Sequence, residues 1–167
     1  MAHPDRRPRT PDLARQVGDL LQAGALRMAS AESCTGGWIA KRMTDIEGSS
    51  RWFDRGFVTY SNEAKHEVLG VREQTLARHG AVSRETVEEM AAGALARSRA
   101  DIAVAVTGIA GPGGGSADKP VGTVWIAWAR RGQAVQAEAR RFGGDRENVR
   151  RAAVHAALVG LAHRLRS

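Results

Sequence analysis

Apolar residues along the chain follow two patterns. Strand-like runs, rich in apolar residues, occupy 26–30, 56–60, 102–106, 122–129 and 134–142. Between them, apolar residues recur every three or four positions, which predicts amphipathic helices. Because strand-like and helical runs alternate, the sequence predicts an α/β fold in which helices flank a sheet.

The connections between the strand-like runs predict how the sheet is built. Helical segments separate the first three runs, as in sheets whose strands are mostly parallel. Only Arg130-Arg131-Gly132 joins the last two runs, and this spacing is typical of an antiparallel hairpin. We therefore expect a mostly parallel sheet with one antiparallel hairpin.

Capping residues mark where helices begin and end. Thr10-Pro11-Asp12 supplies an N-cap, a proline at the first helical position and an acid in the first turn. Gly24 can end that helix. Ser61 or Asn62 caps a short helix that carries Lys65.

The length of 167 residues suits one domain, which we expect over residues 11–167 after a disordered basic arm at 1–10. No apolar run has membrane-spanning length, and the N-terminus lacks the apolar segment of a signal peptide. Cys34 is the single cysteine, so no intramolecular disulfide can form. These features predict a cytoplasmic protein without membrane association.

The net charge of +7 comes almost entirely from arginines. They are spread over the termini and helix faces without interleaved aromatic residues, so we expect no nucleic-acid partner. A positive field would also suit a small anionic substrate such as a phosphate ester. The histidines are scattered, and none forms a ligand spacing with Cys34, so no metal site is expected.

Polar, turn-forming segments follow three of the predicted strands: Ser30–Gly37, Thr59–Lys65 and Thr107–Gly115. In open α/β sheets ligands bind at the carboxyl ends of parallel strands, so these loops would meet in one cleft if their strands are neighbours. The glycine-rich third loop matches neither the dinucleotide-binding nor the Walker pattern. By itself it fits a flexible turn as well as a ligand contact.

The segment Ser33-Cys34-Thr35-Gly36-Gly37 lies between a predicted strand and a predicted helix. A turn at this place presents unpaired backbone N–H groups and the positive end of a helix dipole, which suit an anion or a developing oxyanion. The alternative is an ordinary helix cap with small residues for close packing.

A nucleophilic Ser33 needs a base. His66 and His79 are candidates for a Ser-His pair, but nothing in the sequence marks either ring as oriented by a carboxylate. Lys65 follows a strand end by five residues and could reach the cleft. Burial would lower its pKa from the ordinary value of ~10.4 and make it a base, although a solvated lysine is the alternative.

Several longer motifs occur in a fixed order along the chain. They are AESCTGG at 31–37, GSS at 48–50, VTYSNEAK at 58–65, GAVS at 80–83, TGIAGPGGG at 107–115 and KPVGTVWIA at 119–127. Together they closely resemble the CinA carboxy-terminal family, from about residue 26 to the end. The resemblance implies a three-layer α/β/α sandwich that uses a Ser-Lys dyad, without metal or organic cofactor.

The family motifs also imply roles for single residues. Ser33 takes the place of the catalytic serine, Lys65 that of the lysine, and Tyr60 that of the motif tyrosine, whose hydroxyl would support the dyad. The backbone of Cys34, Thr35, Gly36 and Gly37 would hold the oxyanion. Thr107 and Gly108 would line the nucleotide pocket, and Arg146 would pair with a phosphate. A helix-start salt bridge is the alternative for Arg146.

Active members of this family are nicotinamide mononucleotide (NMN) amidohydrolases. The resemblance therefore implies hydrolysis of NMN to nicotinate mononucleotide and ammonia. The alternative is a catalytically silent family member that senses a nucleotide or binds a partner. Self-association is also expected, because Trp125 and Trp128 lie on the predicted hairpin.

Overall fold

The computed structural model describes residues 12–167. The expected arm at 1–10, with Thr10 and Pro11, lies outside the described residues. The helices are α1 (Leu13–Ala23), α2 (Trp38–Thr44), α3 (Asn62–Leu69), α4 (Glu73–His79), α5 (Arg84–Ala96) and α6 (Arg146–Arg166), with a 3₁₀ turn η1 (Ser49–Arg51). The strands are β1 (Met28–Glu32), β2 (Phe53–Val58), β3 (Ile102–Gly108), β4 (Thr123–Arg130) and β5 (Gln136–Arg141).

The five strands form one mixed sheet in the order β2-β1-β3-β4-β5. Strand β1 pairs in parallel with β2 and β3, whereas β4 runs antiparallel to both β3 and β5. The α/β fold and the antiparallel hairpin of β4 and β5 are confirmed, and the sheet also contains a second antiparallel pair, β3 with β4. The reason is the connection 109–122, which holds no helix, so that the chain turns back and β4 pairs directly with β3.

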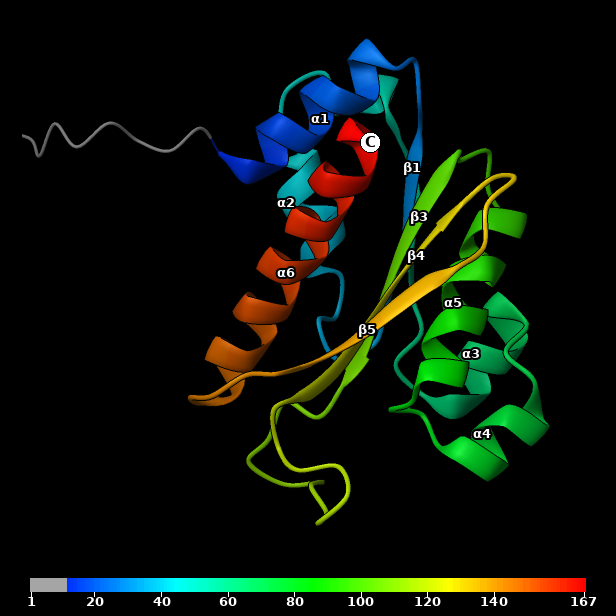
Figure 1. Cartoon of the computed structure of the whole chain (residues 1–167), viewed down its shortest axis with the longest axis vertical. Helices are drawn as coiled ribbons and strands as arrows, with labels where there is room; N and C mark the ends of the chain where they lie inside the picture. Colours follow the sequence, from blue (N-terminus) through cyan, green and yellow to red (C-terminus); the bar gives the residue numbers. More distant parts are fainter. Residues whose placement is uncertain (1–11) are drawn as a thin grey trace, which may run out of the picture.

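Helices cover both faces of the sheet and make the three layers that the sequence predicts (Figure 1). Helices α1, α2 and α6 lie on one face, and α3, α4 and α5 lie on the other. The sheet residues alternate between the two cores, because side chains of a strand point to opposite faces in turn. Met28 thus belongs to the α6-side core, and Ala29 and Ala31 belong to the α5-side core.

Strands β1 and β2 are shifted from the positions that apolar content predicts. Leu26 does not begin β1, because its N–H donates to Leu21 O and closes the end of α1 (2.9 Å). Strand β1 begins only at Met28, which is paired with Phe53 and Ile102 on its two neighbours. Strand β2 accordingly starts at Phe53, earlier than expected from the run at 56–60.

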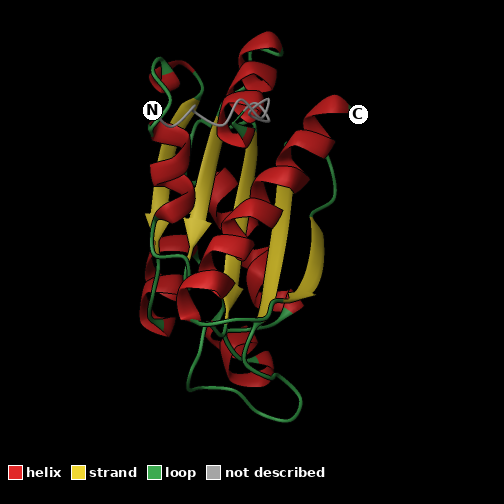
Figure 2. Cartoon of the chain, turned by 90° about the vertical axis from the view of Figure 1, so that its left-hand side faces the viewer, coloured by secondary structure: helices red, strands yellow, loops and turns green. Residues whose placement is uncertain are grey.

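Strand β1 is the point at which the strand order reverses. The chain leaves β1 through α2 to reach β2 on one side, and it later returns through α3, α4 and α5 to β3 on the other side. Figure 2 shows the strands of the sheet side by side with helices packed along them. In open α/β sheets, the crevice at such a switch point is where ligands bind. The fold therefore places the segment after Glu32 at the expected ligand position.

The two tryptophans of the β4–β5 hairpin make contacts within the same chain. Trp128 is buried between the sheet and α6, where its Nε1 donates to Ala157 O (3.1 Å). Trp125 is half-buried, and the Arg84 guanidinium lies 5.1 Å from its ring. The apolar surface on which the expectation of self-association rested is therefore packed within one chain, and self-association stays a prediction. Among residues 12–167, no helix is long and apolar enough to cross a membrane.

Candidate active site

Ser33 stands directly after β1, and the sheet fixes its backbone. Its N–H donates to Val106 O of β3 (3.0 Å), while Glu32 O accepts from Thr59 N just past β2 (2.9 Å). By strand alternation, Ser33 shares the face of Ala31 and Cys34 the face of Met28. The structure agrees, since Cys34 packs in the α6-side core and Ser33 meets α3 on the other side.

Lys65 reaches Ser33 from helix α3. Its Nζ lies 3.0 Å from Ser33 Oγ, 3.0 Å from Thr59 O and 3.3 Å from Tyr60 O. The side chain is almost completely buried, with 1% exposed. Leu69, one turn further on the same face, is buried in the α5-side core, so the packing that anchors α3 also holds Lys65 under Ser33.

No carboxylate lies within salt-bridge distance of Lys65 in the described chain. Burial lowers the pKa of Lys65 below its usual 10.5, with the Cys34 side chain opposing this shift. A neutral amine has two N–H donors and one lone pair. The two main-chain carbonyls can only accept, so the lone pair is left for the Ser33 hydroxyl.

Cys34 has a different environment from Ser33. Its thiol is 6% exposed, and burial raises the pKa of this thiol to about 11. The thiol therefore stays protonated at neutral pH and lies on the side of the sheet away from Lys65. Of the two adjacent side chains, only that of Ser33 has the Lys65 amine beside it.

Glu32 organises the turn that carries Ser33. This completely buried carboxylate accepts from Thr35 Oγ1 (2.7 Å) and from the backbone N–H groups of Ile39 (2.8 Å) and Ala40 (3.1 Å). A protein carboxylate thus occupies the positive end of α2, where the sequence predicted an anion or a developing oxyanion. The first turn of the helix cannot serve an oxyanion, and only N–H groups of the preceding turn are left for one.

The two glycines of the turn have left-handed backbone conformations. Gly36 has φ +60° and Gly37 has φ +99°, which residues with a side chain adopt rarely. A Cβ at Gly36 would also lie 3.3 Å from Arg150 Nη2. Both glycines are therefore required by the shape of the turn.

Arg146, the first residue of α6, connects two of the loops around Ser33. Its Nη1 donates to Gly111 O (3.0 Å) and its Nη2 donates to Tyr60 Oη (2.9 Å). No carboxylate pairs with this exposed guanidinium in the described chain, so the salt-bridged helix start is not the observed arrangement. The Tyr60 hydroxyl contacts Arg146, and only the main chain of Tyr60 contacts the dyad.

Thr107 and Gly108 end β3 next to the Ser33 turn. Thr107 is buried, and its hydroxyl donates to Ala81 O (2.9 Å), which ties β3 to the segment before α5. A Cβ at Gly108 would lie 2.7 Å from Val124 Cγ2, so this glycine permits the close approach of β4. Both residues follow Val106, whose carbonyl accepts from the Ser33 N–H, and their place in a nucleotide pocket stays a prediction.

The two histidine candidates lie away from Ser33. His66 Nδ1 is 2.8 Å from Val71 O, and His79 is 3.7 Å from Glu85. Neither imidazole contacts the Ser33 hydroxyl, whose side-chain partner is Lys65. No cluster of three or more histidine, cysteine or acidic side chains suited to a metal ion occurs within residues 12–167.

Sequence reasoning missed two residues, Glu32 and Arg150. The signal for Glu32 was an acid at the end of a mostly apolar strand, where a carboxylate needs several donors. Arg150 donates to Cys34 O (3.0 Å) and Thr35 O (3.3 Å) from α6. Its only mark in the sequence is its position one helical turn after Arg146.

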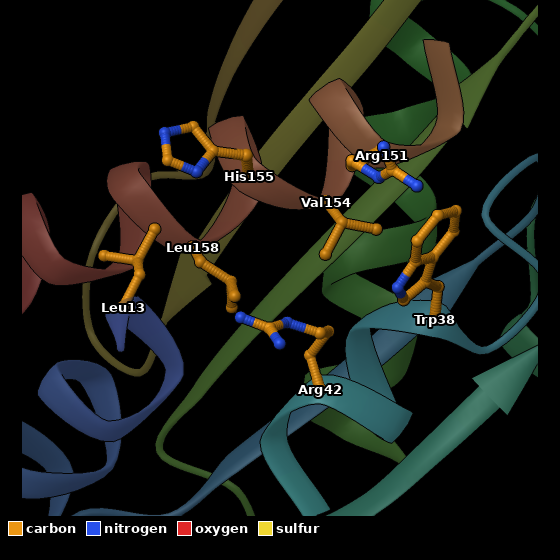
Figure 3. Close-up of a pocket in the computed structure, with 7 residues that line it drawn as sticks. All are labelled: Leu13, Trp38, Arg42, Arg151, Val154, His155 and Leu158. Atoms are coloured by element: carbon orange, nitrogen blue, oxygen red, sulfur yellow. The ribbon is translucent and has the colours of Figure 1, made fainter. Parts of the chain in front are cut away.

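A separate hollow of about 350 Å³ lies on the α6 side of the sheet, between α1, α2 and α6 (Figure 3). Leu13, Val154 and Leu158 form its apolar part, and Figure 3 shows Arg151 beside the Trp38 ring. Neither Ser33 nor Lys65 lines this hollow. It is therefore distinct from the Ser33 site.

We expect Glu32→Gln to destabilise the protein by about 2 kcal/mol, because an amide cannot accept all three hydrogen bonds and leaves a buried donor unpaired. Chemical denaturation measures this loss. Glu47→Gln is the matched control, since Glu47 is exposed, and it should change stability by less than about 0.5 kcal/mol. Equal stabilities for Glu32→Gln and the wild type would show that the carboxylate is not needed to hold the turn.

Comparison with known proteins places these observations in a family. The model of the CinA C-terminal domain matches residues 10–165. The chain is 60% identical over 152 residues to the nicotinamide-nucleotide amidohydrolase PncC of Escherichia coli (strain K12), covering 89% of this chain and 90% of that protein. It is 54% identical over 149 residues to the protein of the same name from Pseudomonas putida, covering 89% and 92%.

A solved structure has the same fold. The competence/damage inducible protein CihA from Agrobacterium tumefaciens superposes with a TM-score of 0.90 at 52% identity, covering 93% of this chain and 94% of that one. The matched regions span nearly the whole chain and include every residue of the Ser33 site. The chain belongs to the CinA C-terminal domain family.

Proposed function

We propose that this protein is a nicotinamide mononucleotide amidohydrolase, which hydrolyses the carboxamide of NMN to give nicotinate mononucleotide and ammonia. The observation that carries the proposal is the buried Lys65 amine, 3.0 Å from Ser33 Oγ and without a carboxylate partner in the described chain. The names of the similar proteins from E. coli and P. putida support this choice of substrate.

In the first step, Ser33 Oγ attacks the carboxamide carbon and its proton moves to the Lys65 lone pair. The C=O double bond opens, and its electrons collect on the oxygen. Backbone N–H groups of the Cys34–Gly37 turn stabilise this oxyanion, at on the order of 3 kcal/mol for each donor. Thr59 O and Tyr60 O hold the resulting ammonium in place by accepting its other two protons.

In the second step, the oxyanion re-forms the carbonyl and the C–N bond breaks. Lys65 returns its proton to the departing nitrogen, which leaves as ammonia, and a nicotinoyl ester remains on Ser33. Lys65, again neutral, takes a proton from water, whose oxygen attacks the ester. Collapse of that intermediate releases nicotinate mononucleotide, and Ser33 recovers its proton from Lys65.

Arg146 is suited to hold the phosphate of the substrate. Its guanidinium is exposed and is oriented by Gly111 O and Tyr60 Oη. A charge-assisted, bidentate contact with phosphate would fix the substrate at the far end from the carboxamide. In this proposal Tyr60 acts on the substrate by orienting Arg146, and on the base through its carbonyl.

The proposal predicts that Ser33→Ala abolishes ammonia release from NMN, while Cys34→Ser keeps most of the wild-type rate. The reason is that only Ser33 has a base within reach, whereas the Cys34 thiol is packed in the core. Ammonia release is measured together with the melting temperature, which controls for folding. An active Ser33→Ala variant would refute the nucleophile assignment. NMN binding without ammonia release by the wild type would instead support a catalytically silent sensing module.

The assignment of Lys65 as the base predicts how kcat/KM depends on pH. Only the neutral amine accepts a proton, and burial lowers the pKa of Lys65 below 10.5, so kcat/KM should rise with pH and level off below pH 10.5. Lys65→Arg should be as inactive as Lys65→Ala, because arginine keeps its proton throughout this range. Lys41→Arg is the matched control, since Lys41 is exposed. Substantial activity in Lys65→Arg would show that the residue supplies charge alone.

The phosphate contact predicts a substrate-dependent effect of Arg146. Arg146→Ala should raise KM for NMN by on the order of 10-fold or more, because a charge-assisted contact is lost. Any turnover of nicotinamide riboside, which has no phosphate, should change little. Tyr60→Phe, which removes one contact that orients the guanidinium, should raise KM for NMN by a smaller factor. Equal losses on both substrates would assign Arg146 a structural role.

A further inference from the structure

Arg150 contacts the Ser33 turn from the side opposite Lys65. It stands one helical turn after Arg146 on α6, and its Nε and Nη2 donate to the carbonyls of two consecutive residues, Cys34 (3.0 Å) and Thr35 (3.3 Å). Its guanidinium also lies 5.5 Å from the centre of the Trp38 ring, which opens α2. The planar fork of the guanidinium therefore fixes two adjacent peptide groups of the turn.

Arg150 donates its hydrogen bonds to main-chain carbonyls and not to a carboxylate. No salt bridge pairs it with a carboxylate in the described chain. The next residue, Arg151, is different, because it donates to Glu147 (3.1 Å) and lies 5.9 Å from the same Trp38 ring. The contact of Arg150 with the two carbonyls is thus a feature of its position and not of arginines on α6 in general.

The hydrogen bond from Arg150 to Cys34 O determines the direction in which the Thr35 N–H of the same peptide group points. In a trans peptide the C=O and the following N–H are antiparallel, so the Thr35 N–H points away from Arg150. Arg150 is on the α6 side of the turn, and Ser33 Oγ faces α3 on the other side. A cation on the carbonyl also polarises the peptide and strengthens its N–H as a donor.

The Thr35 N–H also has no hydrogen-bond acceptor within residues 12–167, so it is available to an oxyanion. Ser33 N donates to Val106 O, and Gly36 N donates to Ser33 O (3.0 Å). Within residues 12–167 no acceptor faces the Thr35 N–H, while its side chain is tied to Glu32. Glu32 on the strand and Arg150 on α6 hold this residue from both sides.

We propose that Arg150 is a positioning residue that aims the Thr35 N–H at the oxyanion formed when Ser33 attacks a carbonyl. The proposal rests on the proposed function in so far as Ser33 is the nucleophile. It adds that the oxyanion donor is the Cys34–Thr35 peptide and that its orientation depends on a side chain from α6, more than a hundred positions along the chain.

Steady-state kinetics of Arg150→Ala on NMN, beside Arg151→Ala, tests this inference. Arg150→Ala should lower kcat by about 100-fold, the effect of losing one oxyanion donor, and should leave KM within about 2-fold. Methylguanidinium in the millimolar range should restore part of kcat by filling the vacated space. Arg151→Ala should keep the wild-type kcat, because Arg151 touches no residue of the turn that carries Ser33.

A second measurement does not need NMN turnover. A fluorophosphonate labels a nucleophilic serine with release of fluoride, and its phosphoryl oxygen uses the same donor. Labelling of Ser33, followed by mass spectrometry, should be slowed by about 100-fold in Arg150→Ala and unchanged in Arg151→Ala. Should the wild type release no ammonia from NMN while this difference in labelling holds, the proposed function fails and the role of Arg150 stands.

Three results would overturn the role of Arg150. A raised KM with unchanged kcat would place Arg150 on the substrate phosphate. Equal labelling rates in Arg150→Ala and the wild type would show that it does not position the donor. The third result is a lowered melting temperature together with a loss of activity that neither methylguanidinium nor Arg150→Lys partly restores. It would make Arg150 a purely structural residue of the α6 contact.

Discussion

The structure of the site depends on a lysine amine buried without a counter-ion. Lys65 Nζ has two main-chain carbonyls and one serine hydroxyl as neighbours, and burial disfavours its charged form. A carboxylate in the place of either carbonyl would favour the ammonium and remove the base. In the mechanism proposed above, the absence of an acid partner in the described chain is what lets this amine accept the Ser33 proton.

The rest of the fold holds the two members of this pair in place. Strand β1 fixes Ser33 through its neighbours β2 and β3, and strand alternation sends Ser33 to the α3 side. Helix α3 has only eight residues, but it is capped at Ser61 and packs closely on α5, where Leu69 O would meet any Cβ at Gly93. The position of Lys65 is thus set by backbone packing, which leaves little freedom for the amine to move.

Charged side chains around the site work mainly on the backbone. Glu32 accepts hydrogen bonds from backbone N–H groups at the start of α2. Arg150, in its proposed role, orients the turn from the other side. The net charge of +7 indicated an acidic partner in general, but it did not tell which arginines face the site. Arg146 and Arg150 do so because they occupy one face of the first turns of α6, where that helix begins beside β1 and the loop after β3.

The sequence by itself determined the α/β class, the five strands, the turn at Ser33 and, through its motifs, the family. These features follow from local periodicity, caps and residue order. It could not decide that β4 pairs antiparallel with β3, nor where β1 and β2 begin, because register depends on neighbouring strands. Only the tertiary structure decided that Glu32 occupies the helix start, that the Tyr60 hydroxyl faces Arg146, and that Arg150 reaches the turn. The contacts of Tyr60 with Arg146 and of Arg150 with the turn join segments far apart in the chain, whose proximity no local pattern encodes.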